Sequence, residues 1–598
     1  MSLIPERLSR LRLYMKTFDI ELCIVPTSDY HQSEYVADYF KYRAYLSGFT
    51  GSAGTLAVTQ DEAKLWTDSR YFLQAEQQLQ GSGIDLMKMR TPGFPTLHEW
   101  IAEQQPKSIG IDAEVFSVSE VNEIKNCITW SHGRIDCSFK SYDAVWKHRP
   151  ALPQSPVFLL DESISGESTQ SKLTRIRKEM AKTGSQSYLL CALDEIAWAF
   201  NLRGSDIAYN PVALCYAMIG LNECRLYIDA DKVNQETADK LAQDGISISG
   251  YQDFAKDVQK LPLYNKVCFD ASKINGLVFE MIPQACEKSD NAKIISRLKA
   301  IKNSTELEGT RRAMIKDGVC FVRFWKQLEE SLERGEQPGE YELAEALAAE
   351  RLKQSSCVGE SFDAIVAYGA NGAIVHYSPQ ADTQARVAPN NILLIDHGGQ
   401  YRLDGTTDMT RTLALYKNKE DIPQAYLKDY AAVLKGNIAL ALAEFPEGTR
   451  GCQLDVLARQ FLWKQACNYG HGTGHGIGHF LNVHEGPQSI RMEENPVNLE
   501  PGMILSNEPG LYKSGAYGIR LETMIAVEER QQSDFGRFFG FETLTICPWD
   551  IHSIAPEYYT EEEINYINQY HQTVYQKLAP YLNEEEEKLW LQEKTKQL

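Results

Sequence analysis

The chain of 598 residues is 43% hydrophobic and 24% charged, and its 81 acidic and 61 basic side chains leave a formal net charge of −20. This composition excludes a disordered, a collagen-like and a membrane-embedded chain. The acidity argues against nucleic acid as a partner, because phosphate backbones are bound by basic faces. At this length we expect several domains and an interior large enough for a buried site.

The cysteines and the N-terminus indicate a cytoplasmic protein. Thirteen cysteines run from Cys23 to Cys547 without a C-x-x-C pair, whereas disulfide frameworks are denser and even-numbered. The first residues, MSLIPERLSRLRLYMK, lack the apolar core of a secretory signal. No stretch approaches the roughly eighteen apolar residues of a membrane span, so we expect no membrane partner.

A weak internal repeat predicts two related α/β domains in the N-terminal half. Residues 7–16, RLSRLRLYMK, align without a gap to residues 172–181, KLTRIRKEMA. Each stretch has the pattern of an amphipathic helix and leads into an apolar strand, at 21–26 and at 187–193. A helix-then-strand unit that recurs in this way favours a duplicated domain over chance similarity.

Two boundaries divide the chain into three predicted domains. The segment at 148–156 holds three prolines, which continue neither helices nor strand ladders. Asn303 and Glu306 have the spacing of a capping box, so we expect a long helix to begin there. The predicted domains are 1–152, 153–301 and 302–598, and the last ends in a helix at 583–594 that Asn583 would cap.

The third predicted domain carries the residues that could bind a metal or act in catalysis. Six of the twelve histidines lie between His376 and His484, which points to a metal or acid/base site. Asp396 follows the apolar run NILLI and Asp408 lies in the strand-like TTDMTRT, so both carboxylates are expected on one hairpin facing a shared cation. The alternative is that these aspartates cap turns, which suits Asp404 but not Asp396.

Two glutamates repeat this pattern farther along the chain. Glu508 follows the apolar MILS and Asn507. Glu522 lies in GIRLETMIAV, where alternation in one strand would place it on the same face as Arg520. The alternative, when that segment is taken alone, is that Glu522 lies on a solvent-facing side of the strand.

The segment HGTGHGIGHFLNVHEGP at 471–487 alternates glycine with histidine. It lacks the Gly-Lys-Ser/Thr of a P-loop, the spacing of a dinucleotide-binding loop and the second histidine of a zincin helix, and the chain has no G-x-S-x-G elbow. Together, four carboxylates and a histidine are neutralised by two divalent cations. Such donors suit Mn²⁺, Co²⁺ or Zn²⁺ rather than copper or an iron–sulfur cluster.

These segments resemble the aminopeptidase P branch of the pita-bread metallopeptidases. The matching motifs are IDHGGQYRLDGTTDMTRT, HGTGHGIGHFLNVHEGP, NEPGLY and GIRLE, joined by HQSEY, SGFTGSAGT and WTDSRYFLQAE near the N-terminus. The resemblance spans nearly the whole chain. It implies an α/β (α+β) protein with two creatinase-like N-terminal domains, followed by a pita-bread catalytic domain, in the layout of the long cytosolic type.

The resemblance also assigns roles to residues of this chain. The implied metal ligands are Asp396, Asp408, His475, Glu508 and Glu522. Glu508 would also transfer protons, His376 would contact substrate and steady the transition state, and His484 would line the site of the substrate proline. His471, Arg70 and Arg520 are assigned to substrate binding with these two histidines, whereas His397 and His479 match no functional position and are expected to be structural.

One departure from the family concerns the two aspartates, which are one residue farther apart here than is usual. The extra residue falls within YRLDG. We expect a longer turn to absorb it, because a slip of register by one residue would turn Asp396 to the wrong face.

The implied reaction is release of the N-terminal residue from peptides whose second residue is proline, with two divalent ions per chain, Mn²⁺ ahead of Zn²⁺ and Co²⁺. A homodimer is implied as well, with the region of Trp463 as a possible contact. The alternatives are an Xaa-Pro dipeptidase, which would lack the middle domain, and a non-catalytic pita-bread module that binds peptides or proteins, which would lack the ligands.

Overall fold

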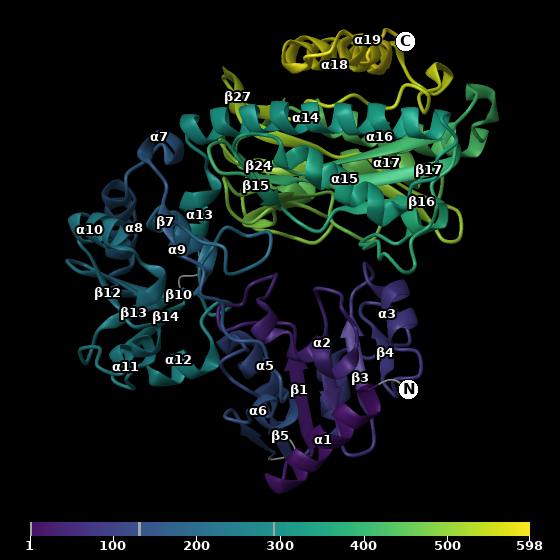
Figure 1. Cartoon of the computed structure of the whole chain (residues 1–598). Helices are drawn as coiled ribbons and strands as arrows, with labels where there is room; N and C mark the ends of the chain where they lie inside the picture. The colour runs from purple at the N-terminus through teal and green to yellow at the C-terminus, as the bar shows by residue number, and fades with distance from the viewer. Residues whose placement is uncertain (1–2, 129–132, 291–292) are drawn as a thin grey trace. The chain divides into compact units, whose positions relative to one another are not determined.

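The computed structural model describes residues 3–128, 133–290 and 293–598. The chain forms two compact units (Figure 1). An N-terminal unit comprises residues 1–162 and 167–296, and a C-terminal unit comprises residues 163–166 and 297–598. In the part of the chain that the structure describes, no helix combines the length and the apolar character that crossing a bilayer requires.

The N-terminal unit contains two six-stranded sheets of identical topology. The first has the order β4-β3-β2-β1-β5-β6 and the second the order β12-β11-β10-β8-β13-β14. In the first sheet β2 pairs antiparallel with both of its neighbours, and in the second sheet β10 does the same. The other three pairs of each sheet are parallel. The strands of the first sheet are Leu22–Pro26, Thr55–Val58, Ala63–Thr67, Asp85–Lys88, Ser108–Gly110 and Arg134–Asp136. Those of the second are Ser187–Leu190, Cys215–Gly220, Cys224–Ile228, Ile246–Ser249, Lys266–Phe269 and Glu287–Asp290.

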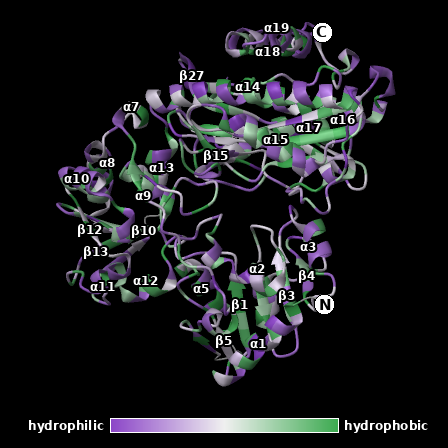
Figure 2. Ribbon diagram, viewed as in Figure 1, coloured by the Kyte–Doolittle hydropathy of each residue, from purple (hydrophilic) through white to green (hydrophobic). Residues whose placement is uncertain are grey.

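The helices that precede β1 and β8 confirm the repeat seen in the sequence. They are α1 (Ile4–Thr17) and α8 (Thr169–Thr183). Their buried side chains occupy equivalent positions, Leu8, Leu11 and Met15 in α1 and Leu173, Ile176 and Met180 in α8. This spacing of three or four residues places one apolar stripe on the sheet. The strands that follow are apolar, as the green of β1 in Figure 2 shows.

The C-terminal unit begins with the predicted long helix. This helix, α14 (Ser304–Glu333), starts at a capping box in which Asn303 accepts a hydrogen bond from the amide of Glu306 and the Glu306 carboxylate accepts one from Asn303. The other main helices are α15 (Glu340–Leu352), α16 (Gln424–Ala441), α17 (Gly451–Trp463), α18 (Glu561–Leu578) and α19 (Glu585–Lys594). The prediction that Asn583 caps the last helix is wrong, because α19 begins two residues later and has no side-chain cap.

Antiparallel sheets fill the interior of this unit (Figure 1). The order β16-β17-β20 joins strands Ile365–Tyr368, Asn390–His397 and Met409–Tyr416. A six-stranded sheet has the order β21-β28-β27-β24-β22-β23, with strands Phe445–Pro446, Gly536–Thr543, Thr523–Ser533, Ile504–Asn507, Gly474–Gly476 and Glu485–Ile490. The smaller pairs are β25 (Gly510–Lys513) with β26 (Tyr517–Arg520), and β18 (Gly399–Tyr401) with β15 (Cys357–Glu360) and β19 (Gly405–Thr406).

The longer segment between the two aspartates is absorbed by a turn. Strands β17 and β20 pair without a bulge from Asn390 opposite Tyr416 to His397 opposite Met409. Between them β18 and β19 form a small hairpin whose turn is residues 402–404. The register between β17, which carries Asp396, and β20, which follows Asp408, is therefore continuous, as the turn explanation expects.

Candidate metal centre

Three side chains from separate segments meet in the C-terminal unit. Each of Asp408, His475 and Glu522 offers one donor atom, and these atoms lie within 4.8 Å of one another. Asp408 directly precedes β20, His475 is the middle residue of β22, and Glu522 connects β26 to β27. Oxygen and imidazole donors at this spacing are those of a site for a divalent cation.

Asp396 lies beside this group at the end of β17. Its carboxylate is 8% exposed, and Oδ2 accepts a hydrogen bond from Nη2 of Arg520. Its other oxygen, Oδ1, is buried and has no hydrogen-bond partner. A buried carboxylate oxygen without a partner is costly, so this atom is suited to a cation.

The imidazole of His475 is oriented by the backbone. Its Nδ1 lies 2.9 Å from the carbonyl oxygen of Gly476, which fixes a proton on Nδ1 and makes Nε2 the ring atom that could bind a cation. Nε2 is 3.3 Å from Oδ2 of Asp408 and 3.6 Å from Oε1 of Glu508. Glu508 follows β24 directly, and its Oε1 accepts a hydrogen bond from the hydroxyl of Ser506 at 3.1 Å.

Glu522 is buried, but not by the mechanism that the sequence pattern predicts. The segment GIRLETMIAV is not one strand, because β26 ends at Arg520 and β27 begins at Thr523. The break turns the 2% exposed Glu522 inward, where its Oε2 accepts a hydrogen bond from the hydroxyl of Thr410 at 2.7 Å. The solvent-facing alternative is wrong.

Burial and mutual repulsion shift the acidities of the cluster. Burial, followed by the charges of Asp408 and Asp396, raises the pKa of Glu522 well above its usual value. Burial also raises the pKa of Asp396, and that of Glu508 to about 7. For His475, burial favours the neutral ring, but the neighbouring Asp408 and Glu508 outweigh it and raise the pKa to about 9. The cluster thus holds more negative charge than the protein neutralises, and two divalent cations fit its donor set.

A hydrogen-bonded chain that the sequence did not reveal supports the centre. His471 Nε2 lies 2.8 Å from the hydroxyl of Tyr512, which accepts a hydrogen bond from Arg520 Nη1 at 2.8 Å. Arg520 in turn holds Asp396. Arg520 is 2% exposed, so these contacts are those of a residue that orients a ligand, and its predicted contact with substrate stays a prediction. The available signal for Tyr512 was its place in NEPGLY, four residues after Glu508.

Two further predicted histidines lie next to this network. The His484 ring stands edge-on to that of His475, with centroids 4.4 Å apart. His376 follows Val375, whose carbonyl oxygen lies 3.4 Å from Nη1 of Arg520. The loop carrying His376 is therefore in contact with the residue that holds Asp396.

The remaining predicted residues lie elsewhere. Arg70 belongs to the N-terminal unit, where it forms a two-pronged ion pair with Asp68, and its role stays a prediction. His397 is fully buried and stacks on Phe321 with centroids 4.9 Å apart, and His479 is 3% exposed. Asp404 was expected to cap a turn, but its carboxylate is instead bound by residues of α14, as described below.

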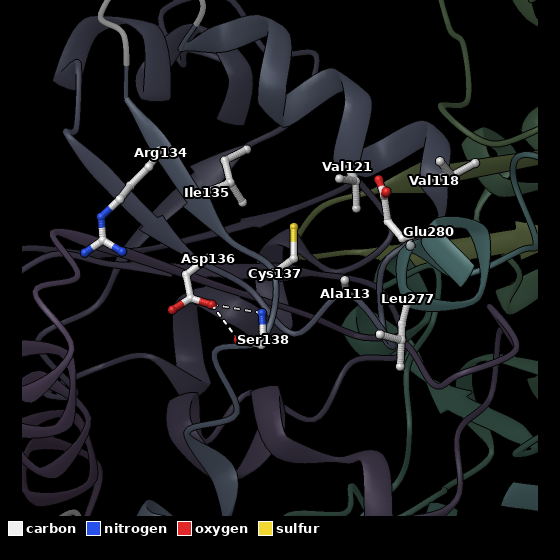
Figure 3. Close-up of a pocket in the computed structure, with 11 residues that line it drawn as sticks. Ala113, Val118, Val121, Arg134, Ile135, Asp136, Cys137, Ser138, Leu277 and Glu280 are labelled. Atoms are coloured by element: carbon white, nitrogen blue, oxygen red, sulfur yellow. Dashed lines mark hydrogen bonds between the residues drawn. The ribbon is translucent and has the colours of Figure 1, made fainter. Parts of the chain in front are cut away.

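A cavity of about 430 Å³ in the N-terminal unit contains none of these residues. It lies between α5 (Val118–Cys127) and β6 on one side and α12 (Gly276–Met281) on the other (Figure 3). The lining is largely apolar, and the Asp136 carboxylate beside it accepts hydrogen bonds from the backbone and hydroxyl of Ser138.

Comparisons with known proteins agree with the architecture. The model of metallopeptidase family M24 matches residues 308–529, and that of the C-terminal region of this peptidase matches residues 537–598. Models of the creatinase/prolidase N-terminal domain match residues 7–138 and 148–306.

Relatives that match nearly the whole chain are described as aminopeptidases P or Xaa-Pro aminopeptidases. The probable Xaa-Pro aminopeptidase P of Coprinopsis cinerea is 40% identical over 99% of this chain and 98% of its own. Aminopeptidase P2 of Arabidopsis thaliana is 37% identical over 100% and 89%. The crystal structure of X-prolyl aminopeptidase from Caenorhabditis elegans, described as a cytosolic enzyme with a di-nuclear active site, matches with a TM-score of 0.94 at 32% identity over 99% of both chains. The chain belongs to metallopeptidase family M24 and, within it, to the Xaa-Pro aminopeptidases.

Proposed function

We propose that this enzyme releases the N-terminal residue from peptides whose second residue is proline, using two divalent cations held by Asp396, Asp408, His475, Glu508 and Glu522. The observation that carries the proposal is the buried donor cluster, with the raised pKa values of Glu522 and Asp396 and the unpartnered Oδ1 of Asp396. The full-length likeness to Xaa-Pro aminopeptidases supports the substrate class.

The residues around the cluster divide the chemistry. Two cations bound there supply a water of lowered pKa and positive charge for the oxyanion. Glu508, which lies beside His475 and Ser506, takes the proton of the attacking water and passes it to the proline nitrogen. His376 donates a hydrogen bond to the carbonyl oxygen as negative charge develops on it. His484 lines the proline site, and His471 and Arg70 bind the peptide.

The metal, the assembly and the location are finer parts of the proposal. We propose Mn²⁺ as the native ion, because carboxylates dominate the donor set and hard oxygen ligands suit it, with Zn²⁺ and Co²⁺ as alternatives. We also propose a cytoplasmic enzyme, consistent with thirteen free cysteines. A homodimer that uses the surface around Trp463, which is 43% exposed, completes the proposal.

Peptide length separates this activity from that of a dipeptidase. The protein is treated with a chelator, supplied again with Mn²⁺, and assayed on Arg-Pro-Pro and on Arg-Pro. We expect Mn²⁺-dependent release of arginine from the tripeptide. Cleavage of Arg-Pro alone would establish an Xaa-Pro dipeptidase. The absence of bound divalent ions, with no cleavage of either peptide, would establish a binding module.

Two substitutions test the assigned residues. Glu508→Ala and His475→Ala should abolish turnover of Arg-Pro-Pro, whereas Glu529→Ala, at an exposed glutamate of β27, should retain it. Normal turnover in either of the first two variants would contradict the site.

A further inference from the structure

A buried ionic cluster lies behind the hairpin that carries Asp396 and Asp408. We call it the Asp317 cluster. Its members are Asp317 of α14, Arg351 of α15, His397, Tyr401 and Thr407. All five side chains are buried, and none is among the predicted ligands.

Asp317 is the centre of this cluster. Its carboxylate is fully buried and accepts hydrogen bonds from Arg351 Nε at 2.9 Å, from the Tyr401 hydroxyl at 3.0 Å and from the Thr407 hydroxyl at 2.8 Å. Thr407 directly precedes Asp408 in the chain. Hydrogen bonds from three directions to one buried charge fix the backbone immediately before that ligand.

Arg351 extends the same hold to the other aspartate. Its Nη2 lies 2.6 Å from Nδ1 of His397, the residue after Asp396. The approach depends on the hairpin glycines, because a Cβ on Gly399 would stand 2.4 Å from Cδ of Arg351. His397, next to Asp396, and Thr407, next to Asp408, are thus both bound by the ion pair of Arg351 with Asp317.

A second contact from α14 holds the turn. Asp404, which is 3% exposed, accepts hydrogen bonds from Arg312 Nε at 2.9 Å and from the Ser356 hydroxyl at 2.7 Å, and it pairs with Lys316. The turn that contains the additional residue is therefore tied to the same helix as Asp317. The hairpin is held at its turn and beside each ligand.

Stability alone does not account for a buried ion pair of this kind. Apolar side chains of similar volume are often as stabilising or more so. A fixed geometry is what such a network adds, and metal sites depend on it: ligands must be held within roughly 0.5 Å, and loss of an outer-shell partner typically lowers metal affinity about 10–100-fold. We propose that the Asp317 cluster is a positioning device that sets the separation of Asp396 and Asp408 and thereby the affinity for divalent cations. This inference rests on the proposed two-metal function.

The test compares metal affinity with folding stability. Apoproteins of wild type, Asp317→Asn and Thr407→Val are titrated with Mn²⁺ by calorimetry, and each apoprotein is melted by circular dichroism. Asp206→Asn is the matched control, because Asp206 forms an equally buried pair with Lys232 at 2.6 Å in the N-terminal unit.

We expect Asp317→Asn to weaken Mn²⁺ binding about 10–100-fold. Thr407→Val keeps the shape of the side chain and removes its hydroxyl, and it should weaken Mn²⁺ binding several-fold. Asp206→Asn should lower the melting temperature without changing Mn²⁺ affinity. Excess Mn²⁺ should restore kcat to the two cluster variants. If Asp317→Asn does not fold, Thr407→Val carries the test.

The positioning role would be overturned if the folded Thr407→Val variant bound Mn²⁺ as tightly as wild type. It would also be overturned if Asp317→Asn lowered only the melting temperature and kept the wild-type affinity. Either result would leave the proposed function intact. Failure of the wild-type protein itself to bind Mn²⁺ would overturn both.

Discussion

Two buried glutamates near the centre are treated in opposite ways. Glu485, at the start of β23, has a fully buried carboxylate that is paired with two buried ammonium groups, Lys299 at 2.6 Å and Lys302. Glu522 is equally buried, yet its carboxylate accepts a hydrogen bond from a neutral hydroxyl, that of Thr410. The charges of Asp408 and Asp396 oppose its ionisation and add to the effect of burial in raising its pKa.

The difference between Glu485 and Glu522 indicates where the protein requires a bound cation. Buried charge must be neutralised, and around Glu485 the chain supplies its own cations. Around Glu522 the one arginine in the network, Arg520, is held by Asp396. The uncompensated carboxylates are those that the sequence pattern assigns to metal, so the site is marked by a local shortage of positive charge rather than by acidity of the whole chain.

The largest effect is expected when the uncompensated glutamate is neutralised. Glu522→Gln removes a ligand, so turnover of Arg-Pro-Pro should fall at least about 1000-fold, beyond the range typical of outer-shell changes. The apoprotein should become more stable, because the change relieves repulsion in the cluster. Metal analysis and urea unfolding of the apoprotein measure the two effects. If this change destabilised the apoprotein, the inference that positive charge is lacking around Glu522 would be wrong.

The reverse result is expected for the compensated glutamate. Glu485→Gln removes the carboxylate that pairs with the buried Lys299 and Lys302, which should lower the free energy of unfolding by about 3–5 kcal/mol. Urea unfolding of the apoproteins measures this effect, with Glu529→Gln on the exposed part of β27 as the control. Equal stability of the two variants would show that the lysines do not depend on Glu485.

How far the sequence predicts these features depends on the range of the interaction. The helix start at Asn303 and the apolar stripes of α1 and α8 were predictable, because capping and periodicity act over a few neighbouring residues. The donor group of Asp408, His475 and Glu522 was predictable from motif order. The Asp317 cluster was not, since Asp317, Arg351 and Thr407 are brought together only by tertiary packing.

Errors arose where local patterns gave way to tertiary contacts. Alternation predicted one strand through Glu522, whereas the chain breaks there to turn the carboxylate inward. Asp404 has the composition of a turn cap, but Arg312 and Lys316 of α14 bind it. In both cases contacts between residues far apart in the sequence decided the outcome, with the hydroxyl of Thr410 for Glu522 and with the cationic side chains of α14 for Asp404.

Removal of the metal should make the stability depend on pH in a defined direction. The pKa of Glu508 rises from 4.5 to about 7 in the native chain, and that of His475 rises from 6.5 to about 9. For both groups the native state therefore binds more protons than the unfolded state, and stability is lost as pH rises through the native pKa.

Thermal unfolding of the apoprotein between pH 5 and 9 should accordingly show a loss of several kcal/mol of stability, since each unit of pKa difference corresponds to about 1.4 kcal/mol. With Mn²⁺ the trend should reverse over the lower part of this range, because binding requires deprotonated ligands. A metal-free protein whose stability rises with pH over this range would be incompatible with a repulsive cluster.

The smallest effect is expected from the hydroxyl that binds Glu522. Thr410→Val keeps the shape of the side chain and removes the hydroxyl that donates a hydrogen bond to Glu522 and accepts one from Arg520 Nε at 3.3 Å. In the apoprotein the Glu522 pKa should rise further, because that bond favours the charged form. Mn²⁺ affinity should fall several-fold, whereas Thr573→Val, at an exposed hydroxyl on α18 that bonds only to the preceding turn, should leave it unchanged. Calorimetric titration distinguishes the two, and equal affinity would show that Glu522 is oriented by its backbone alone.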